Sequence, residues 1–492
     1  MIVTVTKKDE VYLRIDAEPS ILLEMNDFFT FTVPGAQFTP MFRAKMWDGK
    51  IRLLNVFSKE LYIGLIPYVA EFCKENDYTF VDNTNFKLDN VKELETFVND
   101  LNFHSNGKPV DIRDYQLDAV MTAAKRQRTL LLSPTGSGKS LIIYTLMRWH
   151  QQYNRKQLII VPTTSLVEQL YGDFGDYATN SEWKVSENCA RVYSGKEKIT
   201  DFPIVISTWQ SIYKLPKSYF EQFDVIYGDE AHQFKSKSLT TILHKCTKAK
   251  YKIGTTGTLD GTKTHKLVLE GLFGVTYKVT STKKLMDSQQ LAELNISCIQ
   301  LDYPDEDKQL TKKFTYQEEI DWLVTHPKRN KFIRNLTVSQ KGNTLLLFQY
   351  VEKHGQVLYD IISEKVGKER KVFFVHGSVD AEAREEIRAI TEKETDAIIV
   401  ASYGTFSTGI NIRNLHNIIF ASPTKSRIRN LQSIGRGLRL GDNKVSCKLY
   451  DIGDNLSWKT HKNYTLLHLI ERIKIYNEEG FSYKFTTVPI AP

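Results

Sequence analysis

Cysteine is scarce in this chain, and the few cysteines form no pattern. Five of them are scattered along 492 residues. No CxxC pair indicates a zinc site, no spacing indicates a disulfide framework, and the histidines show no metal-ligand spacing. We therefore expect reduced thiols in a cytoplasmic protein, with no bound metal other than the Mg²⁺ considered below.

Long apolar runs and low-complexity tracts are also missing. No run approaches the roughly 18 residues that span a bilayer, and the first residues, MIVTVTKKDE, have no signal-peptide pattern. We therefore expect no membrane partner. The composition, with 41% hydrophobic and 25% charged residues, is that of a globular protein. Because 492 residues exceed one ordinary core, the length predicts two to four domains.

A strong excess of one charge is lacking as well. The formal net charge of +8 favours a polyanionic partner only weakly in a chain of this size. Carboxylates outnumber Lys and Arg before about Asn106, and the positive excess falls mainly between there and Gln290. Any nucleic-acid contact near the N-terminus must therefore be local.

The chain does contain two blocks of alternating strand and helix patterns. The first block has the apolar runs TLLLSP, QLIIVP, IVIST, VIYGDE and YKIGTTGT, and the second has NTLLLFQ, KVFFVHG, AIIVASY, NIIFASP and CKLYDIG. A charged, poorly periodic stretch, DYPDEDKQLTKKF, separates them. Continuous apolar runs between helical stretches indicate parallel sheets covered on both faces. We therefore expect two doubly wound α/β domains, with ligands at the carboxyl ends of the strands.

The stretch LLLSPTGSGKS ends a predicted strand and opens a predicted helix, which is the context of a P-loop. Gly136 and Gly138 would let backbone N–H groups surround phosphate oxygens, with Thr135 and Ser137 in the same loop. Lys139 would reach the terminal phosphates and Ser140 would bind Mg²⁺. Ser133 replaces the usual first glycine, and the alternative is a glycine-rich turn before a helix.

VIYGDEAHQF places two adjacent carboxylates at the end of a predicted strand. Asp229 could hold Mg²⁺ through its waters, and Glu230 could orient and deprotonate an attacking water. Downstream, LQSIGRGLRL offers Arg436 and Arg439, which would share one face of a helix and neutralise charge on a γ-phosphate. The alternative for the arginines is an ordinary solvated helix.

Together these motifs resemble those of superfamily-2 helicases of the DEAH type, which have two RecA-like domains. SPTGSGKS, GDEAH, TGT at 256–258 and QSIGRGLR occur in that family's order, within about residues 110–453. The resemblance implies an ATP hydrolase stimulated by nucleic acid. Its implied catalytic residues are Lys139, Asp229, Glu230, Gln432, Arg436 and Arg439. Ser133, Ser140 and Gly257 depart mildly from the family motifs and remove no charge or phosphate ligand.

Further motifs match the family's ligand contacts. IRDYQLDAV resembles the adenine-reading motif, with Gln116 contacting the base and Arg113 or Tyr115 stacking or positioning it. VPTTSLVEQL, ISTWQSI and GTFSTGINI resemble its nucleic-acid motifs, and Gly409 resembles a position that senses both strand and nucleotide. The strand-contacting residues implied here are Thr163, Thr164, Ser207, Thr208, Gln210, Thr405 and Thr408. Thr163–Ser165 equally suit an ordinary helix N-cap, and Trp209 could stack on a base or fill the core.

FRAKMWDGKIRLL, at residues 42–54, combines cations, a tryptophan and one Asp-Gly pair. Asp-Gly between two β-compatible runs predicts a hairpin with a type I′ turn at Asp48–Gly49. Alternation would then place Arg43, Lys45, Trp47, Lys50 and Arg52 on one face, as expected for a nucleic-acid contact. The alternative is a solvated face on which Trp47 closes the core. A WDG element of this kind resembles the N-terminal domain of the branch-migrating helicases of T-even bacteriophages and their phage relatives.

The expected fold class is α/β, with two RecA-like doubly wound parallel-sheet motor domains preceded by a small α+β N-terminal domain. We expect an auxiliary DNA-binding domain at 1–105, motor domains at 106–290 and 291–455, and a helical extension at 456–492 on the second motor domain. In that extension Leu466, Leu467, Ile470 and Ile473 recur at helical spacing.

The phage resemblance implies ATP- and Mg²⁺-dependent unwinding and branch migration of forked, junction or R-loop DNA in recombination, repair and replication. It also implies 3′-to-5′ travel by a monomer in the host cytoplasm, with DNA and RNA–DNA hybrids as partners. Three alternatives remain open. They are an RNA helicase with the same motor, a double-strand translocase without unwinding, and an ATP-gated annealing module.

Overall fold

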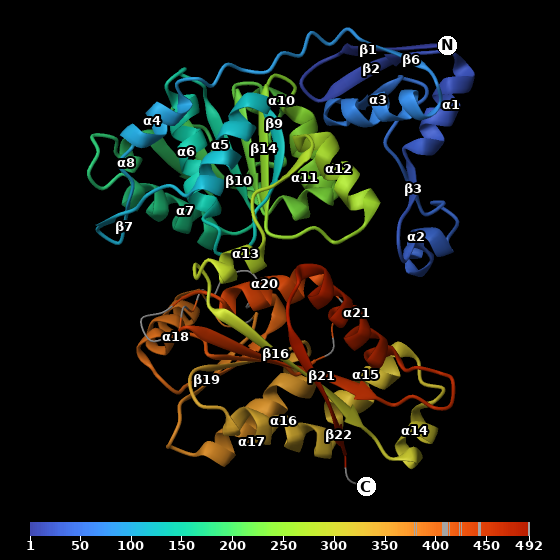
Figure 1. The fold of residues 1–492 in the computed structure, drawn as a ribbon, viewed down its shortest axis with the longest axis vertical. Coiled ribbons are helices and arrows are strands. Elements are labelled where there is room, and N and C mark those ends of the chain that lie inside the picture. Colours follow the sequence, from blue (N-terminus) through green and yellow to red (C-terminus); the bar gives the residue numbers. More distant parts are fainter. Residues whose placement is uncertain are drawn as a thin grey trace. The chain divides into compact units, whose positions relative to one another are not determined.

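The computed structural model describes residues 1–490 apart from 378, 380, 406–411, 413, 423, 425 and 441–443. It forms two compact units, Met1–Ser133 with Gly138–Val279, and Pro134–Ser137 with Thr280–Pro492. Figure 1 shows the fold of both. All five cysteines are buried and unpaired. Among the described helices, none is long and apolar enough to cross a membrane.

The N-terminal part of the first unit is a four-stranded mixed sheet in the order β5-β2-β1-β6. Alternate residues of β1, Val3 and Val5, are buried against helices α1 and α3. The strands of the whole N-terminal part are β1 (Ile2–Lys7), β2 (Tyr12–Asp16), β3 (Thr30–Thr32), β4 (Lys50–Arg52), β5 (Glu60–Tyr62) and β6 (Thr79–Asp82). Its helices are α1 (Pro19–Phe28), η1 (Ala36–Phe38), α2 (Pro40–Arg43), η2 (Ile63–Leu65) and α3 (Ile66–Glu75).

The predicted hairpin around Asp48–Gly49 is wrong. Thr39 caps a short helix, α2, that begins at Pro40, because Pro suits the first helical turn and the Thr39 hydroxyl accepts from Phe42 N. Lys45, with φ +57°, follows the helix in a left-handed conformation. Strand β4 pairs antiparallel with β3 instead of with residues 42–47. The Asp-Gly signal was overridden by this stronger helix-start signal nine residues earlier.

The rest of the first unit is a sheet of seven parallel strands in the order β11-β12-β10-β13-β14-β9-β15. Neighbouring residues on a strand face opposite cores. Leu131 lies in the core under α5, α6 and α7, and Leu130 lies in the core under α10, α11 and α12. The strands are β7 (His104–Ser105), β8 (Lys108–Pro109), β9 (Arg128–Leu132), β10 (Gln157–Val161), β11 (Cys189–Val192), β12 (Ile204–Thr208), β13 (Val225–Asp229), β14 (Tyr251–Thr256) and β15 (Thr276–Lys278). The helices are α4 (Leu94–Asp100), α5 (Asp114–Arg126), α6 (Lys139–Gln151), α7 (Thr164–Tyr177), α8 (Val185–Asn188), α9 (Trp209–Ile212), α10 (Lys217–Phe220), η3 (Ala231–Lys235), α11 (Lys237–Lys245) and α12 (Lys263–Phe273).

The second unit repeats this architecture with seven parallel strands in the order β18-β19-β17-β20-β21-β16-β22. The strands are β16 (Glu293–Asp302), β17 (Thr344–Phe348), β18 (Val372–Val375), β19 (Ile398–Ser402), β20 (Asn417–Phe420), β21 (Ser446–Asn455) and β22 (Tyr483–Pro489). The helices are α13 (Thr282–Asp287), α14 (Asp305–Thr311), α15 (Tyr316–Thr325), α16 (Pro327–Ser339), η4 (Val351–Gln356), α17 (Val357–Val366), α18 (Ala381–Lys393), α20 (Arg427–Gly437) and α21 (Tyr464–Glu479). The predicted fold class is confirmed, and all ten predicted apolar runs are strands.

The C-terminal helix lies on the second motor sheet, but its buried face differs from the predicted apolar face. Helix α21 packs on β21, where Gly453 leaves room for Leu469. Of the predicted apolar face Leu466 is buried, whereas Leu467 is 43% exposed. The buried face instead carries Arg472, held by the buried Asp451. Strand β22 follows α21 and adds a seventh strand to the sheet, which the sequence pattern did not indicate.

Candidate functional site

The predicted P-loop joins β9 to α6 at the carboxyl edge of the first sheet. Ser133 N donates to Thr256 O at 2.8 Å, which fixes the start of the loop beside β14. Gly136 and Gly138 have φ angles of +84° and +81°, which a side chain would strain. Helix α6 starts immediately after Gly138, so its free N–H groups and positive dipole end face the loop. The loop therefore has the geometry of a phosphate cradle.

Gln116 lies directly against this loop. A Cβ added to Gly138 would clash with the Gln116 side-chain amide. Gln116 is buried, and its Oε1 accepts from Arg113 N at 2.9 Å in the capping box that starts α5. Arg113 is exposed and donates to the Tyr115 hydroxyl at 2.8 Å. The structure thus brings the predicted adenine-reading residues to the phosphate loop.

The predicted catalytic lysine and carboxylates meet at the same edge. Lys139 Nζ is 3.5 Å from Glu230 Oε1, although 91 positions separate them in the sequence. Asp229 is buried and accepts from Thr255 Oγ1 at 2.7 Å. Burial raises the pKa of the Asp229 carboxyl, the charge of Glu230 adds to this effect, and Lys139 opposes it. A further cation at this point would stabilise the carboxylate, so these residues fit a divalent metal.

Ser140, the other predicted metal ligand, is on the first turn of α6. Its hydroxyl lies 2.7 Å from the Tyr177 hydroxyl at the end of α7. Burial raises the pKa of Tyr177 further above neutral pH. Sequence reasoning missed Tyr177, because nothing in the sequence signals that the end of α7 approaches the start of α6.

A histidine pair connects the DEAH motif to α12. His232 Nδ1 lies 3.1 Å from Thr256 Oγ1 and 3.3 Å from Glu230 Oε2. His265, on α12, places Nε2 3.0 Å from His232 O and Nδ1 2.8 Å from Asp260 Oδ1. The hydrogen bond from His265 Nδ1 is one of the contacts that hold the pKa of Asp260 well below its usual range, against the effect of burial. Sequence reasoning missed His265, since only the fold brings it to the motif.

The predicted strand-contact residues of the first unit lie just after β10 and at or just after the end of β12, and these two strands are next to each other in the sheet. Thr163 caps α7 by accepting from Leu166 N, and Thr164 is exposed beside it. Ser207 is fully buried and donates to Val192 O at 3.0 Å, so its side chain is not at the surface. Thr208 is also buried, and its hydroxyl lies 2.9 Å from Ser211 Oγ. Gln210 is exposed and donates to Pro162 O at 3.1 Å.

In the second unit, Gln432 and Arg436 are one turn apart on α20 and both are half-buried. Arg439 is beyond the end of this helix at Gly437, so the two arginines do not share a helical face. Buried Lys444, which sequence reasoning missed, donates to Gly437 O and, at 2.9 Å, to Arg439 O. Thr405 is buried and bonded to Ser402. Thr408 and Gly409 lie outside the described residues.

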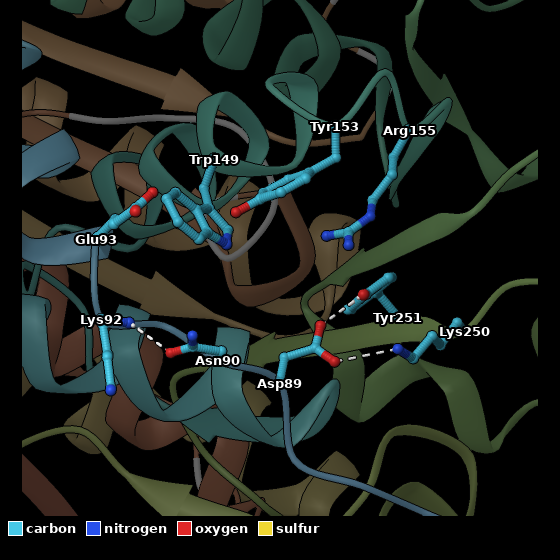
Figure 2. Close-up of a pocket in the computed structure, with 9 residues that line it drawn as sticks. All are labelled: Asp89, Asn90, Lys92, Glu93, Trp149, Tyr153, Arg155, Lys250 and Tyr251. Carbon is cyan, nitrogen blue, oxygen red and sulfur yellow. Dashed lines mark hydrogen bonds and ion pairs between the residues drawn. The ribbon is translucent and has the colours of Figure 1, made fainter.

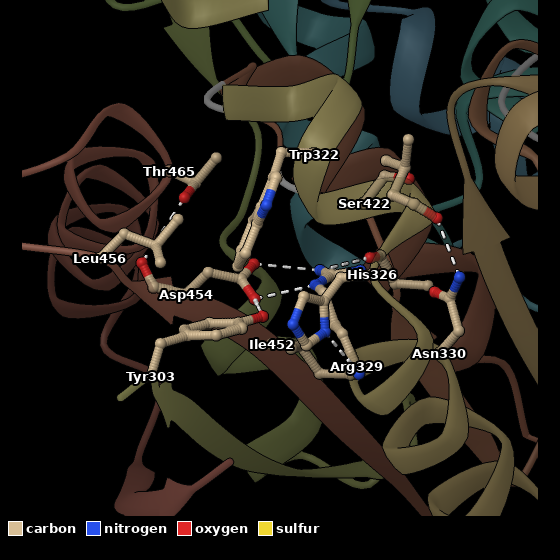
Figure 3. A network of polar contacts seen from close by, with 12 residues as sticks. Tyr303, Trp322, His326, Arg329, Asn330, Ser422, Ile452, Asp454, Leu456 and Thr465 are labelled. Carbon is tan, nitrogen blue, oxygen red and sulfur yellow. Dashed lines mark hydrogen bonds and ion pairs between the residues drawn. The ribbon is translucent and has the colours of Figure 1, made fainter. Parts of the chain in front are cut away.

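Two buried ion pairs lie beside the segment between β20 and α20, and Figure 3 shows the first of them, between Arg329 and Asp454. Arg329 binds Asp454 at 2.8 Å and donates to Ala421 O at 2.9 Å. Tyr303 donates to the same Asp454 at 2.8 Å. Three residues along β21, Asp451 binds Arg472, which donates to Thr424 O at 2.9 Å. Each arginine therefore fixes one carbonyl of the segment that leads into α20.

The four cations among the predicted N-terminal contact residues are exposed, but the set does not form one strand face. Arg43 ends α2, Lys45 follows it, and Lys50 and Arg52 lie on β4. Trp47 is half-buried, and its Nε1 donates to Lys50 O at 2.9 Å, so the indole ties the loop to β4. Arg52 binds Asp48 at 2.5 Å, and this contact lowers the pKa of Asp48.

The N-terminal part packs directly on α12. Added Cβ atoms at Gly64 and Gly271 would collide across this contact, at 2.7 Å from Gly271 O and from Tyr62 Cδ2, respectively. Tyr68 donates to buried Glu270 at 2.5 Å. Arg128 of β9 binds Glu10 at 2.5 Å. The same helix therefore contacts both the N-terminal part and, through His265, the DEAH motif.

A pocket of about 340 Å³ lies at the edge of the seven-stranded sheet of the first unit that is opposite the P-loop (Figure 2). On one wall, Trp149 lies in the last turn of α6 and Tyr153 follows that helix, whose 13 residues place its far end about 20 Å from the P-loop. On the other wall Asp89 accepts from Tyr251 at 2.6 Å and Lys250 at 3.1 Å. These bonds fasten the segment that follows β6 to the motor sheet, so the pocket has a structural explanation.

Comparisons with known proteins agree with this geometry. Residues 3–82 match the family described as DNA helicase UvsW, N-terminal. Residues 109–261 match Type III restriction enzyme, res subunit, and residues 327–441 match Helicase conserved C-terminal domain. The ATP-dependent DNA helicase uvsW of Enterobacteria phage T4 is 37% identical over 98% of both chains.

Solved structures show the same relationship. The crystal structure of T4 UvsW aligns over 100% of both chains with a TM-score of 0.52 and 35% identity. A DNA-bound Type ISP restriction-modification enzyme, LlaBIII, shares the fold at 16% identity, with a TM-score of 0.57 over 86% of this chain and 34% of that one. On the strength of the full-length match to a relative of known class, this chain belongs to the UvsW family and is an ATP-dependent helicase with a superfamily-2 motor.

Proposed function

We propose that this helicase acts on DNA and that it unwinds and branch-migrates forks, four-way junctions and R-loops. The observation that carries the proposal is the convergence of Lys139, Asp229 and Glu230 at one sheet edge beside the P-loop. DNA is favoured over RNA because the relative with 37% identity is named a DNA helicase. The match of the N-terminal part to the UvsW N-terminal family points the same way.

In this proposal the chain's own residues bind and orient ATP. The P-loop, residues 135–140, surrounds the phosphates, and Gln116 with Arg113 recognises the base. Glu230 accepts the proton of the attacking water. The contact between Glu230 and Lys139 breaks when the lysine side chain turns towards the phosphates. Arg436 and Arg439 bring positive charge to the γ-phosphate, and Gln432 offers a neutral amide for hydrogen bonding.

Magnesium fits the donors present, because Asp229 is a buried carboxylate beside the phosphate loop and a cation there would favour its charged form. Burial and the charge of Glu230 raise the pKa of this carboxyl. Ser140 and Asp229 would hold the ion, and Asp229 would act through water. When bound, Mg²⁺ would screen the charge that develops on the phosphates. Tyr177 then has to release the Ser140 hydroxyl, which it contacts in this structure.

For strand contact we propose the exposed groups at the carboxyl edges of both sheets. Thr164 and Gln210 are exposed in the first unit, and Thr163 can offer its helix N-terminus. Ser207, Thr208 and Thr405 are buried and would act by shaping their turns. Thr408 and Gly409 keep their predicted roles as strand and nucleotide contacts. Residues 1–105 form the auxiliary domain, and 106–290, 291–455 and 456–492 the two motor domains and the extension.

The test compares ATP-dependent remodelling of a DNA fork, a four-way junction, an RNA–DNA hybrid and an RNA duplex. We expect rapid turnover of the first three, with Lys139→Ala as the inactive control. Activity confined to the RNA duplex would favour the RNA-helicase alternative. ATP hydrolysis stimulated by duplex DNA without strand separation would favour a translocase. We further expect a monomer that works in the host cytoplasm.

A further inference from the structure

A small protruding lobe in the N-terminal part exposes apolar side chains that the motor does not use. We name residues 33–49, which contain η1 and α2, the apolar lobe. Figure 1 shows β3 and α2 extending away from the sheet formed by β1, β2 and β6. Phe38, Met41 and Met46 are 69%, 55% and 75% exposed, and Phe42 is 37% exposed. Apolar groups gathered at this density on a polar surface mark an interaction site.

Backbone hydrogen bonds hold the apolar lobe in a defined conformation. Val33 N donates to Gly49 O at 2.8 Å, and Met46 N donates to Met41 O at 2.9 Å. Gly49, with φ +76°, lies under the Phe42 ring and Ala36, where a Cβ would fall within 3.1 Å of both. The exposed side chains are therefore presented by a defined scaffold, which lowers the entropic cost of binding with them.

The charge around the apolar lobe indicates its partner. Arg43, Lys45 and Lys50 are exposed, and no carboxylate of the described residues lies within ion-pair distance of them. The nearby carboxylate Asp48 is bound to Arg52. Exposed apolar groups accompanied by exposed cations complement a ligand with a flat apolar face and a phosphate border. The end of a base-paired stack, exposed where a duplex branches, has both features.

We propose that the apolar lobe packs against the exposed base pair at the branch point of DNA, with Phe38, Met41 and Met46 on the base pair and Arg43, Lys45 and Lys50 on the flanking phosphates. This inference rests on the proposed DNA-helicase function. In this proposal the apolar lobe is the element that separates base pairs as the motor moves along the DNA strand. The motor sheets supply the travel, and the apolar lobe blocks the return of the separated strands.

The first experiment replaces Phe38, Met41 and Met46 together by Ser and measures base pairs opened per ATP hydrolysed on a DNA fork. We expect a loss of at least about fivefold. Because all three side chains are exposed, folding should persist. The triple Leu variant keeps the apolar surface and should keep the wild-type ratio. Ile199→Ser with Leu310→Ser, two exposed apolar positions elsewhere, is the matched control and should leave the ratio unchanged.

The second experiment places the photoreactive residue benzoylphenylalanine at position 38 or at control position 199. Crosslinking from position 38 should concentrate within about two nucleotides of the branch point. Uniform crosslinking along the duplex would overturn the proposal, as would equal unwinding ratios for the Ser and Leu variants. A change in oligomeric state of the Ser variant with an unchanged unwinding ratio would show a protein contact instead. If the wild-type protein hydrolyses ATP but opens no fork, the proposed function fails rather than this inference alone.

Discussion

At the scale of single residues, Glu230 stands out because its backbone is left-handed, with φ +50°, directly after β13. This conformation is uncommon for a residue with a side chain and is usually kept at functional sites. It aims the carboxylate at both Lys139 and His232. Glu230 is therefore placed to act as a general base that gives up its contact with Lys139 and contacts a water molecule instead.

Glu230→Gln preserves the size of the side chain and removes its basicity. We expect the maximal rate of DNA-stimulated ATP hydrolysis to fall by about 100-fold or more, since general-base catalysis contributes on that order. ATP affinity should stay within about twofold, because the P-loop is untouched. Steady-state hydrolysis and nucleotide binding measure the two quantities. Glu182→Gln, at an exposed position, is the control, and an undiminished rate in Glu230→Gln would remove Glu230 from catalysis.

A second residue-scale prediction concerns Lys252, which is buried and donates to Glu10 O at 2.7 Å. Burial lowers its pKa to about 7, and the nearby Arg128 adds to the effect. In the unfolded chain the lysine keeps its proton up to about pH 10.5. Between pH 7 and 10.5 the unfolded state therefore binds more protons, so the stability contribution of Lys252 rises with pH.

Thermal unfolding at pH 7, 8 and 9 tests this sign. The stability of the wild-type protein minus that of Lys252→Met should increase across the series, at up to about 1.4 kcal/mol per pH unit. Subtracting Lys252→Met cancels the other groups that titrate in this range. Lys248→Met, at an exposed position, should show a constant difference. A constant difference for Lys252→Met as well would contradict the lowered pKa.

At the scale of elements, α12 has two partners. His265 reaches His232 O on one side, and Gly271 and Glu270 contact the N-terminal part on the other. Nothing in the sequence marked this helix, because its role depends on contacts with segments that are distant along the chain, 33 residues away for His232 and 202 for Tyr68. At the contact between α12 and the N-terminal part, glycines allow two backbones to approach closely. A glycine adds nothing to a periodic pattern of apolar residues, so the sequence carries no sign of this contact.

Gly64→Ala tests this docking. Its Cβ would collide with backbone atoms of Glu270 and Gly271, which cannot yield as a flexible side chain could. We expect a destabilisation of about 1–3 kcal/mol, as for other overpacked sites. Limited proteolysis in the segment between β6 and α4 should also speed up. Gly172→Ala, within α7 where nothing lies within 4 Å, should be neutral or slightly stabilising; equal behaviour of the two variants would exclude a tight docking face.

The loop before α20 depends on the ion pair between Arg472 and Asp451. Arg472→Met would leave a buried carboxylate without its partner, and such losses cost about 3–5 kcal/mol. Adding Asp451→Asn should recover part of the loss by removing the stranded charge. Chemical denaturation of both variants measures the difference. Equal stability of the single and double variants would show that the carboxylate is compensated in another way.

These elements also show how far the sequence predicts the structure. Ten strands were predictable because each is a continuous apolar run, as burial on both faces requires. Four motor strands lack that signal. Strands β11 and β15 are only four and three residues long, β16 begins with alternating exposed and buried residues, and β22 is largely exposed at an edge. The P-loop and DEAH motif were predictable from local order. Arg472 was not, since apolar periodicity does not register a buried ion pair.

At the scale of the whole molecule, charge is distributed unevenly. The N-terminal part is acidic on balance, yet Arg43, Lys45 and Lys50 lie together on and beside the apolar lobe. A modest net charge of +8 therefore hides a local cationic surface. Because DNA binding releases counterions, such a surface should be visible in the salt dependence of affinity even when the affinity itself changes little.

Neutralising Arg43, Lys45 and Lys50 together, each to Gln, tests this consequence. Every lost phosphate contact should lower the slope of log affinity against log salt by about 0.9, so we expect a reduction of up to about 3 for a DNA fork. Fluorescence anisotropy between low and physiological salt gives the slope. Lys74, Lys87 and Lys92, exposed in the same region, provide a matched triple substitution with the same change in net charge. If both triple variants lower the slope equally, the effect belongs to net charge, and the cations around the apolar lobe make no specific contact with DNA.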